Sequence, residues 1–423
     1  MRVHWFSPLL PDPTDIGHFT GRVLRELAKL CAVTVWTETQ APLAELLPGI
    51  EIRHFNPLEP DYATLNRDGV IVYNIGNNGP FHAGIYDMAQ KIPGVVILHE
   101  ADLQGLFSFL WLHQNHEPTR YLAHARKTYG VLGETFARAR LRGIPLDDLA
   151  HRYPIVEPAL SNALGVICHT QQVAELASNQ NLPVLRLNLP FAASDISRAT
   201  DRKGPIRLVQ FGYLNPHRKL DEIFAALAQH PSQQIFRFDI FGRLWDRTYV
   251  SRRIKALGLQ EIVQLRGFVD EDALDQAVAA SDMVFNLRYP TIGEASGTQM
   301  RIWNNSAPSA VTDDGWFKFL PDDTVLKIVP GNEIAEIGSI LDKLAVDRCC
   351  YDPLGARGRA TLIESHSPVD YATAVLEFLK QFGAFERRHS QSSTSNYLRQ
   401  RRNSICADEP EERKAARSGS QTQ

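Results

Sequence analysis

Short apolar runs alternate with segments of helical period along the first half of the chain. In the first helical segment Val23, Leu24 and Leu27 share one face. This alternation predicts an α/β domain with mainly parallel strands. Loops are predicted after Asn56 and around Gly79-Pro80, where proline and glycine gather. The predicted strands are Arg2–Phe6, Ala32–Thr37, Gly69–Ile75, Gly94–Leu98 and Gly165–His169.

The alternation breaks between Leu182 and Lys203 and then starts again. The restart predicts a second doubly wound unit, not a continuation of the first. We therefore expect domains over 1–190 and 200–366, with a helix over 367–386 that returns to the first domain. The second set of predicted strands is Ile206–Phe211, Phe236–Phe241, Ile262–Leu265, Met283–Leu287 and Ser309–Thr312. The predicted helices between them are Leu220–Gln229, Tyr249–Leu257, Ala273–Ala280 and one from about Gly297.

Composition narrows the class of protein. The chain has 423 residues, 44% of them hydrophobic and 22% charged, which is ordinary for a globular enzyme of two or more domains. A net charge of −3 gives no global field for nucleic acid, so anion binding must come from local sites. The five cysteines have no CxxC spacing, so neither a zinc site nor a disulfide framework is expected.

The two ends of the chain carry separate expectations. The N-terminus begins MRVHWFSPLLPDPTD and lacks a long apolar run, so no signal peptide is expected and the cytoplasm is the predicted location. A lipid-linked acceptor would bring the protein to the inner face of the membrane. The segment 387–423 is rich in Ser, Gln and Arg, and we expect it to be disordered.

Ligands of open α/β sheets bind beyond the carboxyl ends of the strands, and the second half has an anion-site candidate there. Gly212 ends a predicted strand in QFGYLNPHRKLDEI, and Arg218 and Lys219 precede a helix. Glycine lets a ligand approach the backbone, and cations at a helix start add to the positive end of its dipole. This combination suits a diphosphate, and a plain strand–helix loop with solvated charges explains it equally well.

A second candidate is the segment NLRYPTIGEASGTQMRIW. Ser296, Gly297 and Thr298 open a predicted helix, whose free N–H groups are suited to an anion; Ser296 or Thr298 could instead serve only as an N-cap. Glu294 is a plausible acceptor for sugar or ribose hydroxyls. Arg301 could reach a phosphate or simply pair with Glu294.

Three further loops follow strand ends. Arg243 comes after Gly242 in FDIFGRLWDR, which is a nucleotide-side position or a simple turn. In the first half, Gly17 and His18 stand at the start of the first helix, on the predicted acceptor side. His99 follows a strand in GVVILHEADL and could orient a sugar hydroxyl, although a lone histidine is more often a core residue.

Together these segments resemble the group-1, retaining glycosyltransferases of the GT-B fold. The resemblance runs from Met1 to roughly Gln381. The segments that carry it are SPLLPDPTDIGHFT, GVVILHEADL, FGYLNPHRKLDEI, RGFVDEDALDQAVAASDMVFNLRYPTIGEASG and DDGWFKFLPDD.

The resemblance implies two Rossmann-like domains facing across a cleft, with the acceptor on the N-terminal side and the nucleotide-sugar donor on the C-terminal side. It implies no metal and no cofactor, because basic side chains and helix N-termini neutralise the leaving diphosphate. Two positions depart from the family's pattern. Tyr213 stands where an arginine usually follows the glycine, and the second position of the Glu-x7-Glu motif falls on Ile302.

The predicted function is transfer of a hexosyl group from a nucleotide-diphosphate sugar to a glycan or lipid-linked acceptor, with retention of configuration. Arg218, Glu294 and His99 are the predicted catalytic residues. The predicted donor-binding residues are Gly212, Lys219, Arg243, Ser296, Gly297, Thr298 and Arg301. The alternatives are a non-catalytic nucleotide-sugar-binding protein and a GT-B sugar-nucleotide epimerase; the residues identify neither the base nor the sugar.

Overall fold

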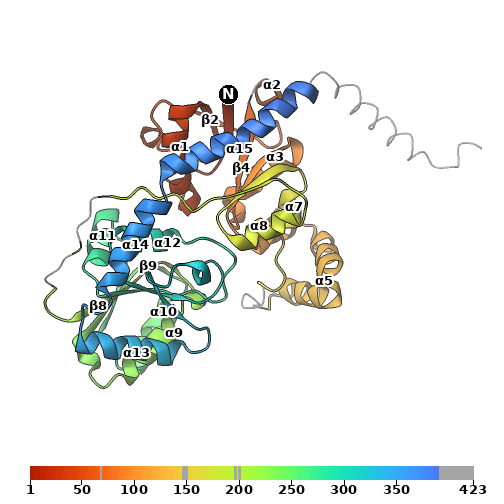
Figure 1. Ribbon diagram of the computed structural model, residues 1–423. Helices are drawn as coiled ribbons and strands as arrows, with labels where there is room; N and C mark the ends of the chain where they lie inside the picture. Colours follow the sequence, from red (N-terminus) through yellow and green to blue (C-terminus); the bar gives the residue numbers. More distant parts are fainter. Residues whose placement is uncertain (67–68, 145–150, 195–197, 199–201, 390–423) are drawn as a thin grey trace, which may run out of the picture.

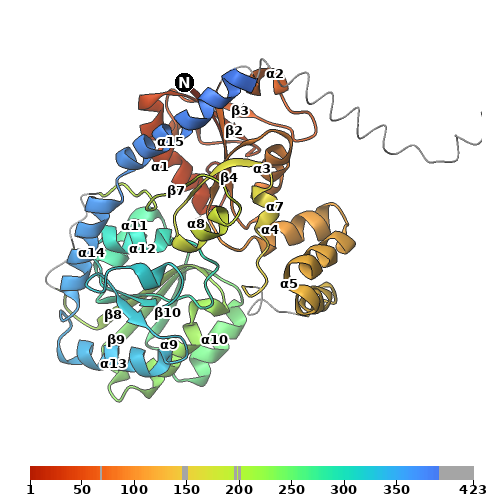
Figure 2. The ribbon, with the colours of Figure 1, turned by 45° about the vertical axis from the view of Figure 1, so that its right-hand side comes forward.

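The computed structural model describes residues 1–66, 69–144, 151–194, 198 and 202–389. It consists of two parallel sheets with helices packed on them (Figure 1). The predicted α/β class and the two doubly wound units are confirmed. Figure 2 shows the same two bodies after a turn, with the α5 region standing out from the side of the N-terminal sheet.

The N-terminal sheet has seven strands in the order β3-β2-β1-β4-β5-β6-β7. The strand order reverses between β1 and β4, which pair in parallel. All five predicted strands are present, and two short, partly exposed edge strands were not predicted. The strands are β1 (Arg2–Phe6), β2 (Ala32–Thr37), β3 (Glu51–His54), β4 (Val70–Ile75), β5 (Gly94–Leu98), β6 (Ala163–Cys168) and β7 (Val184–Arg186).

Helices cover both faces of this sheet, and one of them corrects the sequence analysis. The loop predicted around Gly79-Pro80 is wrong, because α3 begins at Gly79 with Pro80 in its first turn. A missing N–H costs nothing at that position. The helices are α1 (Asp15–Leu30), η1 (Ala44–Leu46), α2 (Tyr62–Leu65), α3 (Gly79–Lys91), α4 (Gln104–Ser108), η2 (Phe109–Gln114), α5 (Pro118–Leu141), α7 (Glu157–Leu160) and α8 (Gln171–Ser178).

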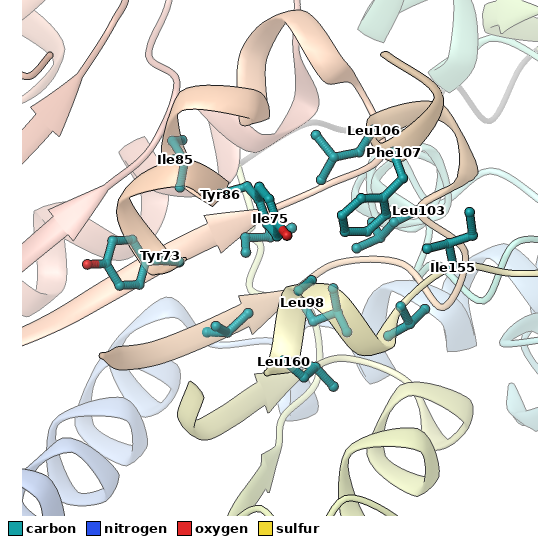
Figure 3. Packing of buried hydrophobic residues seen from close by; sticks show 14 of the residues in the cluster. Tyr73, Ile75, Ile85, Tyr86, Leu98, Leu103, Leu106, Phe107, Ile155 and Leu160 are labelled. Atoms are coloured by element: carbon teal, nitrogen blue, oxygen red, sulfur yellow. The ribbon is translucent and has the colours of Figure 1, made fainter. Parts of the chain in front are cut away.

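The side chains of α3 and α4 meet over the sheet in the larger N-terminal core (Figure 3). Tyr86 of α3 stands edge-on to Phe107 of α4, with ring centroids 5.2 Å apart. Ile75 and Leu98, from adjacent strands, lie beneath them. This packing fixes α3 relative to the carboxyl ends of β4 and β5, where several candidate residues lie.

The C-terminal sheet has six strands in the order β10-β9-β8-β11-β12-β13. Two adjacent strands, β8 and β9, run past their predicted ends, and Gly212 and Gly242 pair in register there. A Cβ on Gly242, whose φ is +101°, would lie 2.2 Å from the Gly212 carbonyl oxygen. The strands are β8 (Ile206–Leu214), β9 (Phe236–Leu244), β10 (Val263–Gly267), β11 (Met283–Asn286), β12 (Ser309–Thr312) and β13 (Leu326–Ile328).

The helical segments of the C-terminal half agree with the predicted ones to within two residues, except that the last helix, predicted over 367–386, extends to His389. Leu220–Gln229 has its predicted bounds, and the helix from Gly297 begins there. The segments are η3 (Pro216–Arg218), α9 (Leu220–Gln229), η4 (Gln233–Ile235), α10 (Arg247–Ala256), α11 (Glu271–Ala279), α12 (Gly297–Asn304), η5 (Phe317–Phe319), α13 (Glu333–Val346), α14 (Asp352–Ser365) and α15 (Pro368–His389).

The last helix, α15, lies against α1 of the N-terminal domain (Figure 1). Tyr371, Val375 and Leu379 are buried in the same core as α1 and the inner strands. Residues 387–389, which the sequence analysis placed in a disordered tail, form the end of this helix, and 390–423 lie outside the described residues. The last described helix therefore packs in the domain where the chain begins.

We expect Leu379→Ala to lower the free energy of unfolding by about 2–5 kcal/mol, because it leaves a cavity under α15. Val369→Ala, on the same helix but 53% exposed, should cost less than about 1 kcal/mol. Urea unfolding of both variants, followed by circular dichroism, measures the difference. Equal midpoints for the two would show that α15 does not stabilise the N-terminal domain.

Candidate functional site

The two domains meet where the carboxyl ends of their strands face each other. Ala101, after β5, donates its N–H to the Ile292 carbonyl at 2.8 Å, and Thr170, after β6, donates its hydroxyl to the Gly293 carbonyl at 3.0 Å. Gly293 has a φ of +78°, and a Cβ there would lie 2.4 Å from the Cβ of Ala101. The loop after β11 is therefore held directly against the N-terminal domain.

Arg218 is buried at the turn between β8 and α9. Gln210 of β8 donates its side-chain amide to the Arg218 carbonyl at 2.7 Å, and Lys219 takes a left-handed conformation with a φ of +59°. The Arg218 side chain is only 2% exposed, and its Nη2 donates to the Phe211 carbonyl at 3.3 Å. Its Nε and Nη1 have no hydrogen-bond partner among the described residues. Burial, and next the positive charge of Arg288, hold the pKa of Arg218 well below its usual value.

Arg288, which the sequence analysis did not select, lies beside Arg218. The N–H of Tyr289 donates to the His217 carbonyl at 2.9 Å, so the loop after β11 runs against the Arg218 turn. Burial lowers the pKa of Arg288 as well. The sequence does contain a signal for Arg288. It is a cation just past a strand end, six residues before Glu294, within the segment NLRYPTIGEASGTQMRIW that the sequence analysis had selected.

Glu294 pairs with Arg288, and not with Arg301 as one alternative had it. One carboxylate oxygen accepts from the Arg288 guanidinium, and the other accepts from the Ile292 N–H at 2.9 Å. Glu294 is buried. The ion pair therefore orients the guanidinium and fixes the loop that bridges the domains.

The start of α12 has the N-cap that the sequence analysis allowed as an alternative. The Ser296 hydroxyl accepts from the Gln299 N–H at 3.2 Å and from the Asn286 amide at 3.3 Å. Its side chain is thus occupied within the protein. Gly297 and Thr298 form the first turn, where backbone N–H groups have no partner within the helix.

Two predicted donor-binding cations do not join this cluster. Lys219 has ion pairs with Glu222 at 3.3 Å and with Glu333 at 3.4 Å. Arg243 is exposed on β9, directly beside Tyr213 in the register of the sheet. The ion pairs of Lys219 therefore neutralise its charge within the C-terminal domain.

Arg301 is paired with α11. Its Nε lies 3.0 Å from Asp275, and a second ion pair joins it to Glu271. Arg301 nevertheless faces the N-terminal domain, since its charge is among the causes that lower the pKa of Arg22 and of His18. The guanidinium therefore lies at the junction with part of its charge already neutralised.

The start of α1 contributes the N-terminal side of the junction. Burial first, and Arg301 next, lower the pKa of Arg22 to about 10, while Asp15 opposes them. The negative charge of Asp15 also favours the charged forms of Arg218 and Arg288. This aspartate thus faces the arginines of the C-terminal domain from the first turn of α1.

Gly17 and His18, the predicted acceptor-side residues, lie in the same turn. A Cβ on Gly17 would lie 3.3 Å from the backbone of Leu9 and Leu10, so the loop after β1 packs closely on the helix. His18 is exposed, and its pKa is lowered by burial of part of the ring and then by Arg22. Gly17 therefore has a packing role, and His18 is open to a ligand.

His99 lies at the end of β5 with a defined hydrogen bond. The Asn74 amide nitrogen donates to the Phe6 carbonyl at 3.0 Å, so the Asn74 amide oxygen faces His99 Nε2 at 3.2 Å. This network assigns the proton to Nε2 and leaves Nδ1 as an acceptor. Burial, and then His169, hold the pKa of His99 well below its ordinary value, so the ring is neutral.

Glu100, which the sequence analysis did not select, is half-buried next to His99. Burial raises its pKa to about 7, although an N–H from Asn77 and the charge of Arg288 oppose the shift. The carboxyl group is thus near half-protonation at neutral pH.

The described residues contain neither a candidate metal cluster nor a candidate membrane span. In the ranges that the structure describes, no group of three or more His, Cys, Asp and Glu side chains could hold a metal ion. None of the helices there has the combined length and apolar character that a membrane span requires.

The raised pKa of Glu100 predicts a pH dependence of stability. Between pH 4.5 and about 7 the folded state keeps a proton that the unfolded state releases, so stability falls as pH rises through this window. Glu100→Gln removes this titration. The fall in the free energy of unfolding across this pH window should therefore be smaller in the variant, by about 1–3 kcal/mol. Urea unfolding near pH 5 and near pH 8 measures it. Exposed Glu45→Gln is the control, and equal pH dependence in both variants would contradict the assignment.

Comparison with known proteins places this geometry in a fold family. No family model matches the chain, and no curated protein matches it. Solved structures do match over nearly the whole chain. HepE from Anabaena, crystallised with UDP-glucose, has a TM-score of 0.62 at 15% identity, over 90% of this chain and 100% of that one.

Two other glycosyltransferase structures align over a similar extent. Sucrose-phosphate synthase from Thermosynechococcus elongatus has a TM-score of 0.57 at 13% identity, over 91% of this chain and 99% of that one. WaaG, a glycosyltransferase involved in lipopolysaccharide biosynthesis, has a TM-score of 0.54 at 13% identity, over 88% and 98%. The chain therefore has the GT-B fold of these glycosyltransferases.

Proposed function

We propose that the protein is a glycosyltransferase that takes a hexosyl group from a nucleoside-diphosphate sugar. The observation that carries the proposal is Arg218, whose Nε and Nη1 lack a partner within the described residues. It lies beside Arg288, where the carboxyl ends of the C-terminal strands meet the N-terminal domain. A pyrophosphate would supply the missing acceptors.

The energetics favour an anion here over a purely structural role. A buried charge without a partner costs several kcal/mol, whereas a planar guanidinium binds a phosphate through two parallel hydrogen bonds. Arg288 adds a second positive charge nearby and thereby raises the cost further in the absence of an anion. Both costs are relieved by one doubly negative group.

The donor is inferred from chemistry and from the structural neighbours. HepE was crystallised with UDP and with UDP-glucose, so UDP-sugars are the first donors to test. Arg218 and Arg288 would neutralise the leaving diphosphate, supported by the N–H groups of Gly297 and Thr298. Glu294 would accept hydrogen bonds from donor-sugar hydroxyls with the lone pairs that its present partners leave free.

On the acceptor side, His99 would accept a hydroxyl proton in a hydrogen bond through Nδ1. We propose transfer with retention, by front-face attack in which the departing diphosphate takes the acceptor proton. The proposed acceptor is a glycan or a lipid-linked glycan. Charge neutralisation by arginines means that the proposal requires neither a bound metal nor a cofactor.

A second candidate is a protein that binds a nucleotide-sugar without transferring it. The observation that favours it is Ile302, which stands buried where the second glutamate of the motif would be. Such a protein would show nucleotide-dependent stabilisation but no release of UDP with any acceptor. The transferase proposal predicts both.

Arg218→Met tests the proposal. We expect UDP-glucose at about 100 times its dissociation constant to stabilise the wild type by about 2.7 kcal/mol, and the variant to lose this stabilisation. UDP release with a panel of methyl glycosides should fall by about 100-fold or more. Without nucleotide, the variant should melt no lower than the wild type, because a buried unpartnered charge is removed.

Arg252→Met, an exposed arginine on α10, is the matched control and should behave as the wild type. The measurements are thermal unfolding with and without nucleotide and a coupled assay for UDP. If no uridine, guanosine or adenosine diphosphate sugar stabilises the wild type, the proposal is wrong. Undiminished UDP release by Arg218→Met would remove Arg218 from the mechanism.

A further inference from the structure

A pocket lies in the N-terminal domain at the point where the strand order reverses. Its volume is about 340 Å³. The loop after β1, the segment that follows β2 and the first turns of α3 line it. In doubly wound sheets the crevice beside such a reversal is the usual place for a ligand. The volume is near the lower end of the range for small-molecule sites, about 300–1,000 Å³, and suits one or two rings better than a long chain.

The walls of the pocket carry two carboxylates. Asp12 accepts a hydrogen bond from the Thr39 hydroxyl at 2.6 Å, and Thr39 in turn accepts from the Leu9 N–H at 3.0 Å. These bonds fix the loop after β1 to the end of β2. Glu38 also lines the pocket, and no side-chain hydrogen bond within the described residues reaches its carboxylate.

Glu38 lies against the backbone of α3. A Cβ added to Gly84 would be 2.1 Å from a Glu38 carboxylate oxygen, so the absence of a side chain at Gly84 makes room for the carboxylate. Phe81, one turn earlier on the same helix, and Pro8 supply apolar surface. The described residues that line the pocket include no lysine, arginine or histidine.

We propose that this pocket holds a pyranose ring of the acceptor that carries neither phosphate nor carboxylate. The proposal rests on the proposed function and names the acceptor chemistry for it. Sugar hydroxyls donate well to carboxylates, and the C–H face of a pyranose packs on an aromatic ring. A phosphate here would face Asp12 and Glu38 without a cation to compensate.

The place of the pocket suits an acceptor. The loop that carries Asp12 continues into the N-cap Thr14 and the first turn of α1. Asp15 in that turn faces the arginines proposed to hold the donor diphosphate. A sugar in the pocket would therefore lie next to the transfer site and on the N-terminal side of it.

Binding of defined sugars tests the proposal without any turnover. Methyl glycosides of glucose, galactose and mannose, and glucose 6-phosphate, are titrated into the full chain and followed by ligand-observed NMR. We expect at least one methyl glycoside to bind and glucose 6-phosphate to bind more weakly. Glu38→Gln should weaken the methyl glycoside by about tenfold or more, as expected for a lost hydrogen bond to a charged group.

Two further variants separate the pocket from general damage. Gly84→Ala keeps the charge but forces the Glu38 carboxylate away, so it should also weaken binding, while alanine in a helix should not lower stability. Glu45→Gln, an exposed glutamate in η1, should change nothing. Tighter binding of glucose 6-phosphate, or unchanged binding in both pocket variants, would overturn the proposal.

The outcome remains distinct from that of the proposed function. Glu38→Gln and Gly84→Ala should keep the stabilisation by UDP-glucose, because neither residue lies with Arg218 and Arg288, which are proposed to bind the diphosphate. If the wild type bound no nucleotide-sugar but did bind a methyl glycoside in the pocket, the result would count against the transferase proposal alone. Normal nucleotide binding with no sugar binding in the pocket would count against the pocket alone.

Discussion

Two hydrogen bonds between the domains organise the rest of the molecule. Ala101 and Thr170, at the ends of adjacent N-terminal strands, hold the carbonyls of Ile292 and Gly293. The same short loop carries Arg288 at its start and Glu294 at its end. Because the loop is fixed from both sides, the arginines of the C-terminal domain face the first turn of α1 in one arrangement.

This arrangement brings two positive charges, those of Arg218 and Arg288, together at the domain junction. Burial, and then the charge of Arg288, lower the pKa of Arg218. Across the junction Asp15 favours the charged forms of both arginines, and Glu100 adds to this effect at Arg288. Glu294 pairs with Arg288, so Arg218 is the guanidinium of the two that has no ion pair within the described residues. The folded protein accordingly keeps a site whose electrostatic energy improves when a further anion enters.

Much of the fold could be predicted from the sequence, because short apolar runs alternating with helical periods form the cores of both domains. The predictions failed where local composition and tertiary context disagree. Pro80 suggested a loop but begins α3, and Gly212 suggested a strand end but pairs within β8 and β9. Arg288 was missed because its importance depends on contact with the Arg218 turn, which no local pattern contains.

The cations of the predicted site differ in the partners that they have within the described residues. Lys219 and Arg301 each have two carboxylate partners within their own domain, which neutralise part of their charge. Arg218 has one weak carbonyl contact and two unsatisfied nitrogens, although it is the most deeply buried of the three. Selection for stability alone would favour an apolar side chain there. The retained guanidinium is therefore best explained by a ligand that completes its hydrogen bonds.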